Sequence, residues 1–305
     1  MKKRVKQQIN LVTSCADRKS LPVSCEMRSV SGLTVEQRVN SWEKLLKQAP
    51  ERCRAVDLYQ GEHWKIAQRI YASDDISLWV ASAGYGLIHA ESQLSGYSAT
   101  FVHQHPDDVI CGTGRSSDRR EWWNALRRHG GVAAPALREI CATGPILVAA
   151  SSAYIDAMAD EISDAISDGA EVLLVTANKL DDPLESRRIA VEGRFRNILG
   201  GSMQALNIRV AEHIINSLED SQMTLAAARK IADDLAEQSP PLKKYSRRTM
   251  SDDEVRSFVA AELRSNTWAS KSALLRKLRD QGYACEQTRF SALFSEAKGL
   301  SGKGR

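Results

Sequence analysis

The sequence lacks the apolar runs that would place it in or across a membrane. No stretch approaches the roughly 18 to 20 apolar residues that a membrane-spanning helix needs. After the basic start MKKRVKQQ, the apolar run at residues 9–12 is shorter than the roughly 7 to 15 residues of a secretory signal. We therefore expect no export signal, no contact with a membrane and a location in the cytoplasm.

Paired cysteines are also absent. The six cysteines stand at positions 15, 25, 53, 111, 141 and 285, with irregular spacing and no C-x-x-C pair. In a chain of 305 residues this spacing favours reduced thiols over a disulfide framework or a zinc site. The short sequence HQH at residues 103–105 is a weak metal pattern. We expect neither a bound metal nor a cofactor.

Excess positive charge is missing from most of the chain and is concentrated at its end. Residues 242–305 contain 14 Lys and Arg residues against 7 Asp and Glu residues, a net charge of +7, whereas the remainder carries −3. Such a segment on a near-neutral body favours a polyanionic partner. A solvated basic surface without a partner is the simpler alternative.

Alternating strand and helix patterns dominate the first part of the chain. Apolar runs bounded by polar or glycine residues predict buried strands at residues 9–15, 76–83, 145–150 and 171–176. Helical spacing predicts helices at residues 35–48, with Thr34 as N-cap, and near residues 64–72 and 154–167; residues 55–59 read as extended. This order predicts an α/β fold with a mostly parallel sheet and helices on both faces.

Residues 101–131 show no clear periodicity, which marks a segment as either functional or poorly ordered. Several arginines in this segment, with Trp122 and Trp123, would suit contact with a nucleic-acid strand through charge and stacking. Equally, the two tryptophans would suit a helix anchored to the core. The sequence leaves both interpretations open.

The second part of the chain reads as a small all-α module. After a helical stretch at residues 206–237, Ser239-Pro240-Pro241 breaks the pattern. We therefore predict an α/β domain at residues 1–238, a linker at 239–249 and a basic three-helix module at 250–305. Ser251 and Glu254 form a capping box for the first helix, Ser270 starts the second, and residues 286–298 form the third.

Three short helices with a glycine-containing turn before the last resemble a helix-turn-helix, whose last helix lies in the major groove of DNA. Modules of this size also bind proteins. The polar residues predicted to bind nucleic acid are Arg276, Lys277, Gln287, Thr288 and Arg289.

Three polar segments of the α/β domain, two of which contain glycine, carry the candidate chemistry. They are SCADRK at residues 14–19, DLYQG at residues 57–61 and SAGYGL at residues 82–87. The first and third follow predicted strands, and open α/β sheets bind ligands beyond the carboxyl ends of their strands. We expect all three to converge on one acidic cavity, where Gly84 and Gly86 allow close backbone approach or positive φ. Ordinary strand-to-helix turns are the alternative.

The order S-C-x-x-x-K, D-L-Y-x-G, S-A-x-x-G-L and then a loop with Tyr97 resembles a prokaryotic and phage family. That family is related to uracil-DNA-glycosylase-like α/β domains, including one in archaeosine tRNA-guanine transglycosylases. The chain is also similar to anti-phage DNA glycosylases that remove modified bases from viral DNA. The resemblance spans about residues 9–101, with weaker support to about residue 215. It implies an enzyme of base excision in antiviral defence, with DNA as partner.

The implied reaction is hydrolysis of an N-glycosidic bond, in which a carboxylate stabilises the cationic sugar. Asp57 is the first choice for this carboxylate and Asp17 the second; a turn cap is the structural alternative for Asp57. Tyr59, Tyr85 or Tyr97 would stack on an extruded base. The predicted substrate-binding residues are Ser14, Cys15, Lys19, Tyr59, Gly61, Ser82, Gly84, Tyr85, Gly86 and Tyr97.

Two other functions fit the same sequence. A non-catalytic regulator would sense a nucleotide or nucleobase with the α/β domain and bind DNA with the basic module. A nuclease would need a carboxylate cluster for Mg²⁺, and the Asp pairs at residues 74–75, 107–108 and 181–182 are the available candidates.

Overall fold

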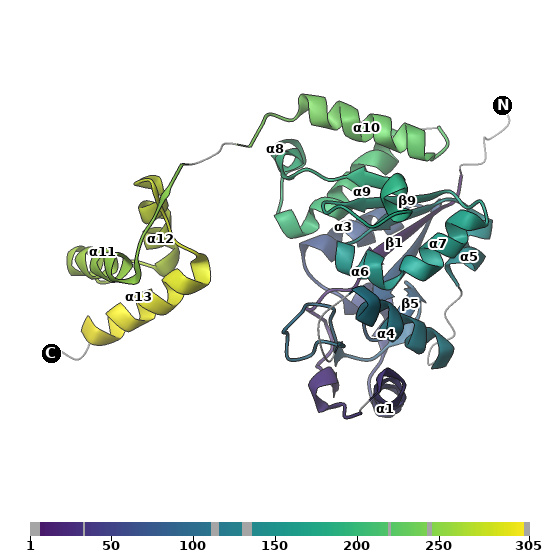
Figure 1. The fold of residues 1–305 in the computed structure, drawn as a ribbon, viewed down its shortest axis with the longest axis horizontal. Coiled ribbons are helices and arrows are strands. Elements are labelled where there is room, and N and C mark those ends of the chain that lie inside the picture. Colours follow the sequence, from purple (N-terminus) through teal and green to yellow (C-terminus); the bar gives the residue numbers. More distant parts are fainter. Residues whose placement is uncertain are drawn as a thin grey trace. The chain divides into compact units, whose positions relative to one another are not determined.

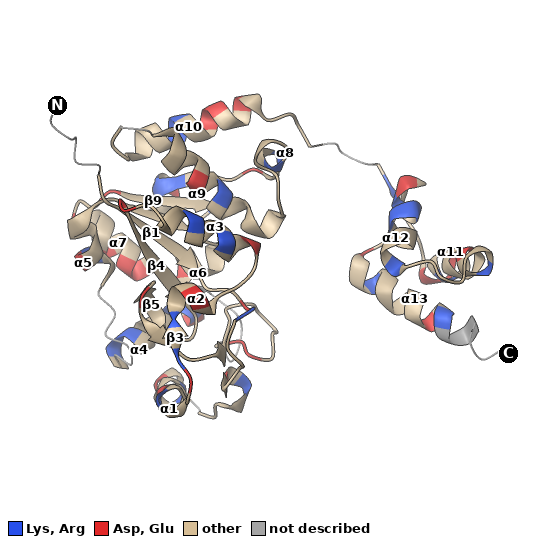
Figure 2. Ribbon diagram, turned by 180° about the vertical axis from the view of Figure 1, so that it is seen from behind, with Lys and Arg blue, Asp and Glu red and all other residues tan. Residues whose placement is uncertain are grey.

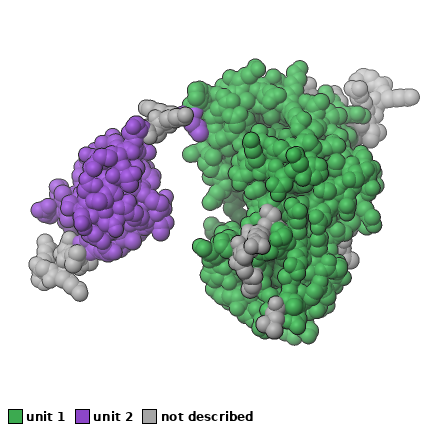
Figure 3. All heavy atoms as spheres, viewed as in Figure 1, with its two compact units in different colours: residues 1–241 green, residues 242–305 purple. Residues whose placement is uncertain are grey.

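The computed structural model describes residues 7–32, 34–110, 116–129, 136–218, 221–242 and 246–301. The chain forms two compact units, Met1–Pro241 and Leu242–Arg305 (Figure 3). Their boundary falls inside the segment at residues 239–249 that the sequence predicts as a linker. In the described ranges no helix combines the length and the apolar character that crossing a membrane requires.

Unit 1 is built on a six-stranded sheet, which confirms the predicted α/β class. The strand order is β10-β9-β8-β1-β4-β5, and every neighbouring pair is parallel except β4 and β5. Four of these six strands lie where the apolar runs predict buried strands. The strands are β1 (Ile9–Ser14), β4 (Ile76–Ser82), β5 (Gly86–His89), β8 (Ile146–Ala149), β9 (Val172–Thr176) and β10 (Arg188–Ala190).

Helices cover both faces of this sheet (Figure 1). One face carries α3 (Glu62–Tyr71), α9 (Leu206–Ser217) and α10 (Leu225–Gln238). The other carries α1 (Val35–Gln48), α4 (Ser116–His129), α5 (Leu137–Ile140), α6 (Ser152–Ala157) and α7 (Ala159–Ser167). Burial on both faces explains why the parallel strands are continuous apolar runs.

The shorter elements join these layers. Two-residue strands pair outside the main sheet, β2 (Cys25–Glu26) with β7 (Tyr97–Ser98) and β3 (Cys53–Arg54) with β6 (Gln93–Leu94). The helix α8 spans Arg196–Leu199. Single turns of 3-10 helix are η1 (Met27–Ser29), η2 (Cys141–Thr143), η3 (Leu184–Arg187), η4 (Gly193–Phe195) and η5 (Met203–Ala205).

The strand order creates a switch point beside β1. The chain passes from β1 through α3 to β4 on one side, and later returns with β8 on the other side. Thr13 near the end of β1 pairs with Ala149 of β8, and Ser14 pairs with Ala81 of β4. The carboxyl ends of β1, β4 and β8 therefore share one edge. At such a point the connections diverge and leave a crevice for ligands.

Several local predictions are confirmed and others are wrong. The helix at residues 35–48 is present, and Thr34 caps it in a box with Gln37. Residues 55–59 are not extended, because Ala55–Leu58 forms the short helix α2. A short buried apolar run does not distinguish strand from helix. The stretches at residues 154–167 and 206–237 are each divided into two helices.

The two tryptophans of residues 101–131 anchor a helix to the core and are not available to stack on a nucleic acid. Trp122 and Trp123 of α4 are completely buried, so they anchor this helix to the core. The indole Nε1 of Trp122 donates to the carbonyl of Ala83 at 2.8 Å, and that of Trp42 in α1 donates to the carbonyl of Gly84 at 2.7 Å. Both helices thereby fix the loop that follows β4. Arg115 of the same segment lies outside the described residues.

Unit 2 contains the three predicted helices around a core of its own. They are α11 (Asp252–Ser265), α12 (Lys271–Asp280) and α13 (Gln287–Ser301), and β11 (Arg248–Thr249) pairs in parallel with β12 (Tyr283–Ala284). The Ser251–Glu254 capping box and the Ser270 cap are both confirmed. The buried core comprises Met250, Val255, Val259, Leu263, Leu274, Leu275, Leu278, Cys285, Phe290, Leu293, Phe294 and Ala297.

The indole bond of Trp122 is expected to contribute measurably to stability. Trp122→Phe leaves the buried carbonyl of Ala83 without this donor. The matched control is Trp64→Phe, because Trp64 is equally buried and its Nε1 has no hydrogen-bond partner among the described residues. We expect Trp122→Phe to have a free energy of unfolding lower than that of Trp64→Phe by about 1–3 kcal/mol in urea denaturation. Equal losses would contradict a role for the hydrogen bond.

Candidate functional site

A buried chain of hydroxyl groups ties two of the three candidate segments together. The phenol oxygens of Tyr59 and Tyr97 are 2.9 Å apart, and Ser82 Oγ lies 2.6 Å from the Tyr97 oxygen. Ser82 Oγ also accepts the backbone N–H groups of Gly84 at 3.2 Å and Tyr85 at 3.0 Å. The segments that begin at residues 57 and 82 therefore meet at the loop that carries Tyr97.

Complete burial assigns these hydroxyls a structural role. Tyr59, Tyr97 and Ser82 are at most 1% exposed, and burial raises the pKa of both phenols well above the usual value. Rings enclosed in this way cannot stack on a base, so base stacking is reassigned away from Tyr59 and Tyr97. Gly84 is required by the same packing, because a Cβ there would lie 2.6 Å from the Tyr97 ring.

Lys19 connects the first segment to this cluster. Its backbone pairs with that of Tyr59, and its Nζ donates to the carbonyls of Ala16 at 3.1 Å and Asp17 at 3.0 Å. The ammonium also lies 4.3 Å from the centre of the Tyr97 ring. Burial lowers the pKa of Lys19, and the nearby Cys15 and carboxylates partly oppose this shift. Lys19 thus fixes the turn that follows β1.

Cys15 and Tyr154 meet across the switch point. Cys15 follows β1, Tyr154 lies in α6 after β8, and Cys15 Sγ is 3.1 Å from the Tyr154 oxygen. Burial raises the pKa of the Tyr154 phenol well above its usual value, and the charge of Asp17 acts in the same direction. The exposed carboxylate of Asp17 therefore lies in the field of both Tyr154 and Lys19. Sequence reasoning missed Tyr154, which only the fold brings here.

His63 is a second residue that sequence reasoning missed. Its Nε2 is 2.6 Å from Thr13 Oγ1, whose own proton is donated to the carbonyl of Ala149 at 2.9 Å. The imidazole must therefore donate from Nε2, which leaves the lone pair of Nδ1 available. Burial lowers the pKa of His63 to about 4, so the ring is neutral near pH 7. Its position two residues after the D-L-Y-x-G segment was the available signal.

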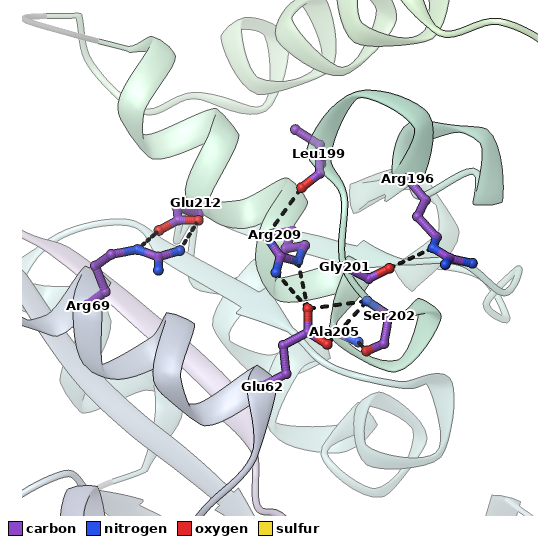
Figure 4. A network of polar contacts seen from close by, with 9 residues as sticks. All are labelled: Glu62, Arg69, Arg196, Leu199, Gly201, Ser202, Ala205, Arg209 and Glu212. Atoms are coloured by element: carbon purple, nitrogen blue, oxygen red, sulfur yellow. Dashed lines mark hydrogen bonds and ion pairs between the residues drawn. The ribbon is translucent and has the colours of Figure 1, made fainter.

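The orientation of His63 depends on how α3 is held against its neighbours. Glu62 accepts from Arg209 Nη2 of α9 at 2.6 Å and from the backbone N–H of Ser202 at 3.2 Å (Figure 4). These donors lower the pKa of Glu62 to about 2. Further along the same helix, Arg69 pairs with Glu212 at 2.6 Å. The start of α3, and His63 with it, is therefore fixed from the α9 side.

Asp57, the first choice for the catalytic carboxylate, lies at the surface. Its Oδ2 is 2.7 Å from Arg54 Nε, and Arg54 also contacts Glu91 at 3.1 Å. An open groove of about 670 Å³ runs beside it. The groove is lined by Arg18, Asp57, Tyr59, Gln60, Gly61, Glu62, Trp64, Lys65 and Gln68. Gly61 precedes α3 with φ of 108°, a conformation that favours glycine.

Gly84 and Tyr85 open onto a different depression, a half-open cavity of about 50 Å³. Tyr85 is half-buried, and its phenol accepts the backbone N–H of Ser95 at 3.1 Å. Buried Glu43 also lines this cavity, and its Oε1 has no hydrogen-bond partner among the described residues. The expectation of a single acidic cavity shared by all three segments is therefore corrected. The second and third segments adjoin through buried hydroxyls and Lys19 joins the first to them, but Asp57 and Gly84 line separate depressions.

Two remaining predicted residues sit at strand ends. Ser14 is the last residue of β1 and is half-buried at the carboxyl edge. Gly86 begins β5 with φ of 75°, so the hairpin between β4 and β5 requires a positive φ that glycine adopts readily. A Cβ at Gly86 would meet no atom within 4 Å, which distinguishes it from the tightly enclosed Gly84.

The predicted nucleic-acid-binding residues of unit 2 are unequally available. Figure 2 shows Lys and Arg interleaved with Asp and Glu over its helices. Arg276, Gln287 and Thr288 are exposed. Lys277 pairs with Glu262 at 2.8 Å, and Arg289 pairs with Asp252 at 2.5 Å. Only part of the predicted set is therefore without a competing carboxylate.

Within the described residues, no group of three or more His, Cys, Asp or Glu side chains is placed to hold a metal ion. No protein-family model matches the chain, and no curated protein or solved structure matches it either. The function of the site is therefore inferred from its own residues.

The neutral state of His63 predicts a pH dependence of stability. Because its pKa falls from 6.5 in the unfolded chain to about 4, the unfolded state binds more protons between these values. The contribution of neutral His63 to the free energy of unfolding is fully present above about pH 6.5 and is lost as the pH falls toward 4. Between pH 7 and pH 5, the wild type should lose about 2 kcal/mol more than His63→Gln, which keeps a donor but does not titrate.

Urea denaturation of both proteins at the two pH values measures this difference. Parallel losses of stability in wild type and His63→Gln would show that folding does not lower the pKa of His63.

Proposed function

We propose that this protein is a DNA glycosylase-type hydrolase that cleaves the N-glycosidic bond of a modified base. One observation carries the proposal. The carboxyl edge of the sheet, at the switch point beside β1, holds the exposed carboxylate of Asp17 close to half-buried Lys19 and to Cys15 and Tyr154. The neutral ring of His63 lies at the end of the same strand, on Thr13.

The chemistry of base removal explains what such a group of residues would do. As the bond between C1′ and the base nitrogen breaks, the electron pair leaves with the base and C1′ becomes cationic. A water molecule then adds to C1′ and loses its proton, and the departing base gains one. The reaction needs a fixed carboxylate beside C1′, a group that positions the water and a donor to the base.

We assign the carboxylate to Asp17 in place of Asp57. The Asp57 carboxylate is bound by Arg54 at 2.7 Å and is about half exposed, so its charge is already compensated. Asp17 has no such ion pair among the described residues, and it follows the central strand at the switch point. Asp57, on the surface helix α2, retains the role of a local ion-pair partner.

The other groups of the edge complete the proposed mechanism. The neutral His63 ring, with its lone pair on Nδ1, accepts a hydrogen bond from the attacking water. Tyr154 keeps its proton because burial raises the pKa of its phenol, so it donates to the departing base. Lys19 holds the backbone of Asp17 and contributes positive charge that favours a phosphate nearby.

DNA is the proposed partner because of unit 2. Residues 242–305 carry a net charge of +7, which suits the phosphate backbone, and exposed Arg276 has no acidic partner among the described residues. The sequence resemblance to anti-phage glycosylases supports viral DNA with modified bases as the substrate, and a role in defence.

A regulator that binds a nucleobase without changing it is the second candidate. It is favoured by the half-open cavity that Gly84, Tyr85 and Gln93 line with Glu43. Exposed Gln93, in the lining of this cavity, offers both a hydrogen-bond donor and an acceptor to the edge of a base. This function predicts retention of an intact ligand and no release of free base.

Matched substitutions test the enzymatic proposal. Phage DNA carrying modified bases is incubated with each protein, and alkali then converts abasic sites into strand breaks. We expect Asp17→Asn to lower the rate of break formation by about 100-fold or more, because the cationic sugar loses its stabilising charge. Asp57→Asn should retain most of the activity and is the control for loss of a surface carboxylate.

Two results would overturn the assignment. Loss of activity in Asp57→Asn but not in Asp17→Asn would return the role to Asp57. Absence of strand breaks and of free base with the wild type, on every modified DNA that the protein binds, would favour the regulator.

A further inference from the structure

One tryptophan of unit 2 stands apart from all others in the chain. Trp268 lies between α11 and α12 and is 92% exposed. Of the five other tryptophans, Trp79 is half-buried and the remaining four are completely buried. Only the backbone N–H of Trp268 has a partner, the Asn266 side chain at 3.0 Å; within the described part of the chain its indole has none. The ring is thus presented to solvent.

The core of unit 2 does not need this ring. The buried cluster is formed by side chains of α11, α12 and α13 with Met250 and Cys285, and Trp268 is not a member. An exposed indole offers a large apolar and aromatic surface, which is valuable chiefly in contact with another molecule. Folding therefore does not account for a tryptophan at this position.

Positive charges flank the exposed ring on both sides in the sequence. Arg264 comes four residues before it at the end of α11, and Lys271 comes three residues after it at the start of α12. Both side chains are exposed, and in the described ranges neither has an ion pair with a carboxylate. An aromatic ring between two available cations suits a polyanion that also offers planar rings.

The start of α13, where sequence reasoning places the main DNA contact, is less suited to phosphate. The Glu286 carboxylate accepts the first backbone N–H groups of this helix, from Thr288 at 2.8 Å and Arg289 at 2.7 Å. Arg289 is itself paired with Asp252. Negative charge therefore occupies that helix end, whereas residues 264–271 contain two cations, Arg264 and Lys271, and no carboxylate.

We propose that Trp268 stacks on an unpaired base of a nucleic acid, with Arg264 and Lys271 contacting the adjacent phosphates. The face of a base is open to a side chain only where the base is out of the helical stack, as in a single strand or beside an extruded nucleotide. The inference depends on the proposed function only in taking nucleic acid as the partner. It adds a preference of unit 2 for unpaired bases.

Binding measurements on the full-length protein test the proposal. Fluorescence anisotropy compares a labelled, unmodified single strand with its duplex at one salt concentration, for wild type, Trp268→Ala and Trp268→Phe. We expect Trp268→Ala to weaken binding of the single strand roughly tenfold or more, and Trp268→Phe to retain most of the affinity. Binding of the duplex should change by less than about twofold.

Two control variants separate stacking from other effects. Ile198→Ala removes an exposed apolar side chain of unit 1, 45% exposed, and should leave both affinities unchanged. Arg264→Gln should weaken single-strand and duplex binding alike and reduce the salt dependence of both. Binding of the single strand should also quench tryptophan fluorescence in the wild type but not in Trp268→Phe.

These binding measurements test stacking by Trp268 independently of the enzymatic proposal. Unchanged affinity in Trp268→Ala, or an equal loss for single strand and duplex, would overturn stacking on an unpaired base. Unmodified DNA cannot report base release, so a glycosylase assay that fails leaves this result intact. Conversely, a Trp268→Ala variant that releases base and binds the single strand normally would support the enzymatic proposal and contradict the stacking role of Trp268.

Discussion

The buried hydroxyl chain of Tyr59, Tyr97 and Ser82 is the constraint on which the candidate site depends. Each hydroxyl is removed from water and is satisfied by another hydroxyl or by the backbone N–H groups that follow β4. Breaking one link would leave a buried polar group unpaired, which typically lowers the free energy of unfolding by about 1–3 kcal/mol. Three segments far apart in the sequence are thereby held at the same edge of the sheet.

The electrostatic character of this edge follows from the packing. Burial keeps His63 and the phenol of Tyr154 neutral, while Asp17 remains exposed to water. Groups that differ in environment at one edge can therefore hold different protonation states at the same pH, which is a common arrangement where acid and base chemistry occur. In open α/β sheets, ligands bind beyond the carboxyl ends of the strands at a switch point such as the one beside β1.

The two units divide the proposed task between chemistry and binding. Unit 1 has a large core that fixes the polar edge, whereas unit 2 is small and carries the excess positive charge. In unit 2 the ion pairs of Lys277 and Arg289 compensate part of that charge. Among the described residues, the cations that flank Trp268 have no such ion pairs. The net charge of unit 2 therefore does not show which of its cations are available to a partner.

The sequence by itself determined the elements whose cause is local. Periodic apolar residues specify β1, β4 and α1, and side-chain oxygens specify the caps at Thr34 and Ser251, because these preferences act within a few residues. Only the tertiary structure decided which side chains share the candidate site. The carboxylate of Asp57 turns to Arg54, while His63 and Tyr154 reach the end of β1 from other elements. Those outcomes depend on strand order and burial, which are non-local and leave no periodic signal in the chain.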